Sequence, residues 1–171
     1  ELVLGEPLAG REMGQPRARI VERIGRMSEP KTISLIAIHA HGIPDHLPAN
    51  VIDEAESAQA ATVEGRTDLR KIPLVTIDPP DARDHDDAVW AEPDEDPANK
   101  GGFKAIVAIA DVAFYVRPGS SLDREAIKRG NSCYFPDRVV PMLPEHLSAG
   151  LCSLKEKQDR AVLACYMTFD A

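Results

Sequence analysis

The order of apolar and polar positions divides the chain into short strands and helices joined by polar turns. Apolar runs predict strands at residues 72–77, 88–90 and 103–109, and a longer run at 160–169 predicts one more. Residues 92–102 are rich in Pro, Gly, Asp and Asn, which predicts a hairpin connection between two of these strands. The chain therefore contains several strands that need a buried face.

Helices are predicted between the strand regions. Residues 30–41 carry apolar positions and stop at Gly42, which is typical of a helix end, and residues 50–59 predict a second short helix. Residues 17–24 fit a strand or a helix, and we interpret them as the last strand of a small β-barrel. Together these elements indicate the α+β class.

Carboxylates are concentrated between the first two predicted strands. Residues 78–87 hold five aspartates, and four of them are candidate ligands: Asp78, Asp84, Asp86 and Asp87. Most acidic runs are solvated loops, but this one is flanked by apolar runs, and Pro79 and Pro80 stiffen it. Clustered carboxylates repel one another, so a hard cation is the usual means of keeping them ionised, and oxygen ligands suit Mg²⁺ or Mn²⁺. His85 could add a ligand, but we expect its ring to point away.

Two other metals fit the spacing poorly. Counting an EF-hand loop from Asp84 places Ala88 and Val89 where a ligand and a glycine are required. Zinc is disfavoured because the three cysteines form no Cys-x-x-Cys pair, and His39 and His41 lack the spacing of two ligands on one helical turn.

The aspartate spacing, together with further motifs, resembles the catalytic region of the ribonuclease II and ribonuclease R (RNB) family. The matching motifs are Thr76-Ile-Asp, Ala82-Arg-Asp-His-Asp-Asp-Ala-Val89, Ala108-Ile-Ala-Asp-Val112, Tyr115-Val-Arg-Pro118, Leu122-Asp-Arg-Glu125, Tyr134-Phe-Pro136, Pro141-Met-Leu-Pro144 and Leu147-Ser-Ala-Gly-Leu-Cys-Ser-Leu154. The ribonuclease R branch fits better, because its versions of the aspartate and Tyr-Phe-Pro motifs are nearer to this sequence.

This resemblance implies three regions. Residues 1–28 would be the end of a cold-shock, OB-like β-barrel, residues 29–65 a helical linker, and residues 66–171 the N-terminal part of an RNB catalytic domain with a mixed β-sheet core. The sequence has no initial Met and a predicted strand at its very end. We therefore expect it to be a fragment of a longer protein.

The resemblance also implies an activity, namely hydrolysis of RNA from a single-stranded 3′ end with release of nucleoside 5′-monophosphates. The four aspartates would bind two Mg²⁺ ions, with Mn²⁺ as a substitute: Asp78 and Asp87 hold the better-ordered ion, Asp84 completes the coordination, and Asp86 is most critical for chemistry. Two cations about 3.5–4 Å apart can activate water, stabilise the leaving 3′-oxygen and neutralise the phosphate. Neighbouring side chains in an extended segment point to opposite sides, so Asp86 and Asp87 should act differently.

Tyr134 is the further residue that the resemblance marks, as an aromatic that stacks on the 3′ nucleotide. Such stacking suits a non-selective exonuclease because every base has a π face. The alternative is an ordinary core tyrosine beside Phe135. Lys128, Arg129 and Arg138 could contact phosphates. For Lys128 and Arg129 we favour the interpretation that they end a helix at residues 123–129 with Gly130 as its cap.

Charge does not by itself reveal an RNA partner. The net charge is −8, and residues 51–100 hold most of the excess, with five basic and fourteen acidic residues. Bound divalent cations would offset part of this charge. The sequence shows no signal peptide and no apolar run near 18 residues, and its cysteines are unpatterned. We therefore expect a cytoplasmic protein without a membrane partner or small-molecule cofactor.

Two functional hypotheses follow. The first is a segment of a metal-dependent exoribonuclease, and the second is a non-catalytic module that keeps the scaffold and binds RNA or protein. The intact aspartate quartet favours the first. In either case we expect the isolated fragment to be inactive, because the family's further catalytic groups lie downstream, and to self-associate through exposed apolar surface.

Overall fold

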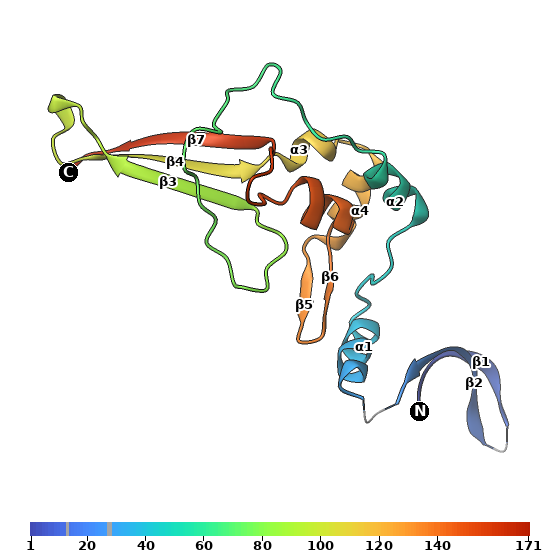
Figure 1. The fold of residues 1–171 in the computed structure, drawn as a ribbon. Helices are drawn as coiled ribbons and strands as arrows, with labels where there is room; N and C mark the ends of the chain where they lie inside the picture. The colour runs from blue at the N-terminus through green and yellow to red at the C-terminus, as the bar shows by residue number, and fades with distance from the viewer. Residues whose placement is uncertain (13, 27–28) are drawn as a thin grey trace. The chain divides into compact units, whose positions relative to one another are not determined.

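In the computed structural model, residues 1–12, 14–26 and 29–171 are described. They form two compact units, one of Glu1–His46 with Asn131–Val140 and one of Leu47–Gly130 with Pro141–Ala171 (Figure 1). The first unit contains β1 (Leu2–Glu12), β2 (Gln15–Gly25), α1 (Pro30–Ala40), β5 (Cys133–Phe135) and β6 (Arg138–Val140). The second contains α2 (Ala49–Glu56), β3 (Asp87–Pro93), η1 (Pro97–Asn99), β4 (Phe103–Ala110), α3 (Val112–Tyr115), α4 (Ser121–Arg129), η2 (Leu147–Leu151) and β7 (Val162–Phe169).

The first unit is built from two hairpins and a helix. β1 pairs with β2, and β5 pairs with β6, each antiparallel. α1 confirms the helix predicted at residues 30–41, and Gly42 follows it with a φ of +62° that favours glycine. β2 confirms a strand at residues 17–24. A single hairpin does not establish a barrel, so the assignment of residues 1–28 to a cold-shock domain stays a prediction.

A three-stranded antiparallel sheet, in the order β3–β4–β7, forms the centre of the second unit (Figure 1). The turn-rich segment joins β3 to β4 as predicted, with η1 inside it. The apolar run at residues 103–109 forms the predicted strand, but only one of its faces is buried. Ile106 and Ala108 are buried, whereas Phe103 is 50% and Ile109 44% exposed, because alternate side chains point to opposite faces of the sheet.

The predicted strand at residues 72–77 is largely absent. Its contribution to the sheet is one isolated bridge between Val75 and Val89, and Ile77 is 84% exposed. Pro73 has no amide hydrogen for a ladder, and Leu74 donates its own amide hydrogen to the oxygen of Ile72 at 2.8 Å. The segment before the aspartates therefore runs as an extended loop.

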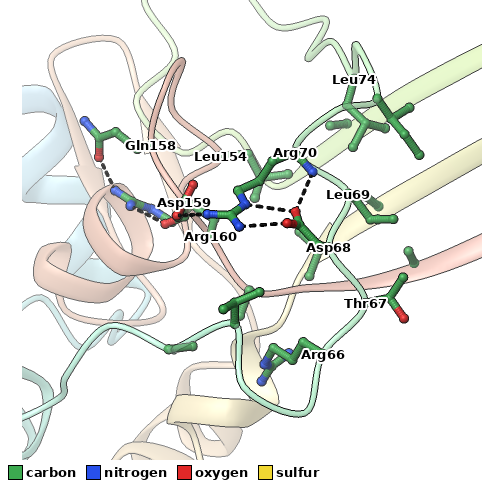
Figure 2. Close-up of a pocket in the computed structure, with 18 of the residues that line it drawn as sticks. Arg66, Thr67, Asp68, Leu69, Arg70, Leu74, Leu154, Gln158, Asp159 and Arg160 are labelled. Atoms are coloured by element: carbon green, nitrogen blue, oxygen red, sulfur yellow. Dashed lines mark hydrogen bonds and ion pairs between the residues drawn. The ribbon is translucent and has the colours of Figure 1, made fainter.

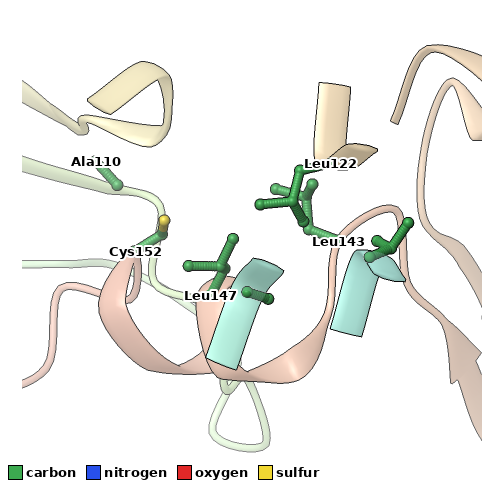
Figure 3. Packing of buried hydrophobic residues seen from close by; sticks show 7 residues of the cluster. Ala110, Leu122, Leu143, Leu147 and Cys152 are labelled. Atoms are coloured by element: carbon green, nitrogen blue, oxygen red, sulfur yellow. The ribbon is translucent and has the colours of Figure 1, made fainter. Parts of the chain in front are cut away.

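The hydrophobic core lies where the helices of the second unit pack against one end of the sheet (Figure 3). It consists of Val51, Ala55, Ala110, Leu122, Leu143, Leu147 and Cys152. The start of α4 is fixed by Ser120, whose hydroxyl accepts from the amide of Asp123 at 3.1 Å. Gly130 ends α4 with a φ of +78°, which confirms the predicted glycine cap.

Truncation in this core should lower stability strongly. Leu147 is 0% exposed, so Leu147→Ala should reduce the free energy of unfolding by about 2–5 kcal/mol through lost burial and a residual cavity. Leu163→Ala is the matched control, because that side chain is 76% exposed and should change stability by no more than about 0.5 kcal/mol. Urea unfolding followed by circular dichroism measures both. Equal losses of stability in the two variants would show that Leu147 is not part of the core.

No helix among the residues that the structure describes has the length and apolar character needed to cross a membrane.

Candidate active site

The loop that carries the aspartates is closed by a turn and a side-chain contact. The amide of Ala82 donates to the oxygen of Pro79 at 3.0 Å, which reverses the chain after Asp78. This reversal places Nδ1 of His85 2.8 Å from Oδ2 of Asp78. The expectation that the His85 ring points away is therefore wrong, because the turn directs it at the first aspartate of the quartet.

The pKa values of two carboxylates of the loop are shifted in opposite directions. The hydrogen bond with His85 lowers the pKa of Asp78 below its usual value. The pKa of Asp86 is raised, first because the surrounding protein partly desolvates the carboxylate, and then because Asp84, Asp87 and Asp78 add negative charge nearby. Burial and the three neighbouring carboxylates thus both disfavour the anionic form of Asp86.

The end of the loop is fixed by the sheet. The amide of Ala110 donates to the oxygen of Asp86 at 2.9 Å. Asp87 is the first residue of β3 and pairs with Ile109 of β4. Side chains alternate along a strand, so Asp87 lies on the face opposite the buried Ala88. The backbone of the last two aspartates is therefore anchored, whereas the rest of the loop has no regular secondary structure.

The donor chemistry of the loop suits an oxygen-liganded cation. Burial raises the pKa of the nearby Cys152 thiol to about 11, so it stays protonated and is a poor metal ligand at neutral pH. The anionic donors of the loop are then carboxylates, and Mg²⁺ and Mn²⁺ prefer such oxygen ligands. Across residues 1–12, 14–26 and 29–171, no three His, Cys, Asp or Glu side chains are gathered closely enough to enclose a metal ion.

Tyr134 lies in β5, in the first unit. Its side chain is 67% exposed, so the alternative of a core tyrosine is wrong. The aspartates belong to the second unit. Tyr134 and the four aspartates therefore belong to different units, and each is described by itself.

Arg129, one of the basic residues before Tyr134, has a structural role. The side chain of Arg129 is 2% exposed and lies 2.9 Å from a carboxylate oxygen of Glu125. It also donates to the oxygen of Pro141 at 3.1 Å. These contacts agree with the interpretation of Lys128 and Arg129 as the end of a helix, and they make Arg129 unsuitable as a phosphate contact.

Two hollows lie in the second unit. The larger, about 890 Å³, has Ala88, Ala108 and Ala164 of the sheet in its lining, and the ion pairs of Arg70 with Asp68 and Asp159 lie at its wall (Figure 2). The four aspartates are all described, and none of them lines this cleft. A smaller hollow of about 380 Å³ does border their loop, with Ala82, Arg83, His85, Glu145, Ala149 and Lys155 in its lining.

Comparison with known proteins identifies the class. The family model for the RNB domain matches residues 66–171, so the chain belongs to the RNB family. Among curated relatives, ribonuclease R of Vibrio cholerae is 51% identical over 155 residues, covering 88% of this chain and 18% of the relative. Ribonuclease R of Acidithiobacillus ferrooxidans is 49% identical over 166 residues, covering 95% of this chain and 36% of the relative. The chain thus spans a fifth to about a third of these relatives.

Solved structures agree on the fold. Mycoplasma genitalium RNase R in complex with double-stranded RNA matches 92% of this chain and 28% of that chain, with a TM-score of 0.82 and 32% identity. Yeast Ssd1, a pseudonuclease, matches 97% of this chain and 21% of that chain with a TM-score of 0.64 and 18% identity, which shows the fold alone. The resemblance to the ribonuclease R branch inferred from the motifs is confirmed.

Proposed function

We propose that this chain supplies the acidic site of a metal-dependent 3′–5′ exoribonuclease. Its substrate would be RNA with a single-stranded 3′ end, and its products nucleoside 5′-monophosphates. The observation that carries this proposal is the placement of all four aspartates in one loop within the RNB match, with Asp78 bound by His85 and Asp87 in the first position of β3. Membership of a family whose similar relatives are ribonucleases R supports it.

The aspartates Asp78, Asp84, Asp86 and Asp87 would hold two Mg²⁺ ions, with Mn²⁺ as a substitute. Such ions, when bound, activate water and neutralise charge on the scissile phosphate. Because like charges repel, a cation would draw the four side chains together. The chain's own part is to supply the carboxylates, to keep Asp86 and Asp87 fixed at the start of β3, and to hold Asp78 through His85.

Tyr134 would bind the 3′ nucleotide by stacking. Its side chain is largely exposed, and stacking of a base on an aromatic side chain contributes about 1–3 kcal/mol without regard to sequence.

The second hypothesis is a non-catalytic module on the same scaffold. The fold does not decide between the two, since a pseudonuclease shares it. All four aspartates are present, and a binding module would have no need of them, which favours the enzyme. Cytoplasmic location and the division into residues 1–28, 29–65 and 66–171 also stay proposals. The three cysteines, all free thiols, are compatible with a reducing compartment.

The isolated 171-residue chain should show little exonuclease activity. It spans 18% of the Vibrio cholerae relative, and residues 101–171 carry nine basic and eight acidic residues, too small an excess to hold a polyanion at physiological salt. The test is a 5′-labelled single-stranded RNA with Mg²⁺, followed on a gel for shortening by single nucleotides. A longer chain of the relatives' length, carrying the same residues, should degrade it. Processive degradation by the isolated chain, lost on Asp86→Asn, would contradict the expectation of inactivity.

The isolated chain should also self-associate. β7 lies at the edge of the sheet, and the paired Ile109 and Leu163 are 44% and 76% exposed on its open face. Such a face and edge favour pairing between copies. Sedimentation velocity should show the mean sedimentation coefficient rising with concentration, and Leu163→Glu should suppress the rise. A coefficient that is independent of concentration would show that the face stays free.

A further inference from the structure

A serine outside the aspartate loop holds the backbone of that loop. Ser153 follows η2 and is 0% exposed. Its hydroxyl donates to the oxygen of Arg83 at 2.9 Å and accepts from the amide of His85 at 3.2 Å. The two backbone groups flank Asp84. One buried hydroxyl therefore fixes the chain on both sides of a predicted metal ligand.

Neighbouring contacts extend this attachment. The amide of Leu154 donates to the oxygen of His85 at 2.8 Å. The Nε of Arg160 donates to the oxygen of Ser153 at 2.9 Å and so holds the serine in turn. The backbone amide of His85 is thus bound by Ser153, and its backbone oxygen is bound by Leu154. The ring of His85 meanwhile lies against Asp78.

We propose that Ser153 is a positioning residue for the cation-binding carboxylates. The loop has no regular secondary structure, and its carboxylates repel one another. Without the hydroxyl, the oxygen of Arg83 and the amide of His85 lose their shared partner, and the aspartates on either side can spread apart. Groups that orient metal ligands in this way typically change metal affinity by about 10–100-fold when removed. This inference rests on the proposed metal-dependent function.

The alternative is that Ser153 only satisfies buried polar groups. That role would lower stability without changing the affinity for a cation. A matched control separates the two roles. Ser120 caps α4 through a hydrogen bond to the amide of Asp123, so Ser120→Ala should lower stability and leave the aspartate loop unchanged.

The experiment compares wild type, Ser153→Ala and Ser120→Ala as the full 171-residue chain. Mn²⁺ affinity is measured by electron paramagnetic resonance, melting temperature is measured in EDTA, and backbone motion at residues 84–87 is measured by NMR relaxation without metal. Ser153→Ala should weaken Mn²⁺ binding by about tenfold or more and increase motion in the loop. Ser120→Ala should lower the melting temperature but keep the Mn²⁺ affinity within about twofold of wild type, since its cap lies outside the loop.

The outcomes separate the inference from the proposed function. If wild type binds Mn²⁺ and Ser153→Ala binds it equally well, the positioning role is overturned, whatever happens to stability. If wild type does not bind Mn²⁺, the proposed metal site itself fails. Should Ser153→Ala not fold, Ser153→Cys has the same shape and is only slightly larger, but it offers a weaker donor and acceptor, and the same loss of affinity is expected. Wild-type affinity in Ser153→Cys would then overturn the proposal.

Discussion

Asp86→Asn, in a chain of the relatives' full length, should lower the rate of RNA hydrolysis by orders of magnitude and leave RNA affinity nearly unchanged. Asp84, Asp87 and Asp78 add negative charge near Asp86, whose carboxylate is one of the four proposed cation ligands. Binding of a cation there would therefore depend on the charge of the Asp86 carboxylate. The amide keeps the size of the side chain and removes that charge. Single-turnover hydrolysis and RNA binding, measured separately, distinguish a chemical defect from a binding defect.

Stability supplies an independent check on this variant. The folded-state pKa of Asp86 lies above its usual value, so at neutral pH the ionised carboxylate is less favourable in the folded than in the unfolded chain. A neutral Asn should therefore maintain or raise the melting temperature in EDTA. Asp81→Asn is the control, because Asp81 lies in the same loop, outside the quartet, and is exposed. Equal losses of activity in both variants would refute the role assigned to Asp86.

Local patterns predicted most of the elements of the second unit. The strand at residues 160–169, the hairpin at 92–102 and the glycine cap at Gly130 all follow from short-range chemistry. The strand at residues 72–77 failed because apolar content was given more weight than Pro73, which cannot donate to a sheet. Partial exposure of β4 could not be predicted either, since its sequence is apolar on both faces and only the tertiary arrangement shows which is covered.

The candidate site divides in a similar way. The aspartates could be found because their spacing is short and specific, and the sequence places them before a strand. The contact of His85 with Asp78 depends on a turn whose direction the sequence did not reveal. Ser153 was also missed, because it lies 68 residues beyond His85 along the chain and a single serine in a motif gives no sign of what it binds. The sequence alone therefore did not predict the hydrogen bonds that hold the aspartate loop.

The double variant Asp78→Asn with Asp87→Asn should lose Mn²⁺ binding in the 171-residue chain. These two residues approach the proposed site from opposite ends of the loop, one held by His85 and one in the first position of β3. Removing both leaves two carboxylates of the quartet, which are too few anionic ligands for the two divalent cations proposed here. The loss should exceed that of either single variant.

Isothermal titration calorimetry with Mn²⁺ measures this effect, and circular dichroism in EDTA checks the fold. Asp81→Asn again serves as the control, because it removes one negative charge from the same loop without touching the quartet. If general electrostatic attraction explains binding, this control should weaken Mn²⁺ affinity about as much as Asp78→Asn does. If the quartet forms a specific site, the control should retain the wild-type affinity. Binding by the double variant with wild-type affinity at millimolar Mn²⁺ would remove the metal site from these residues, and with it the physical basis for hydrolysis here.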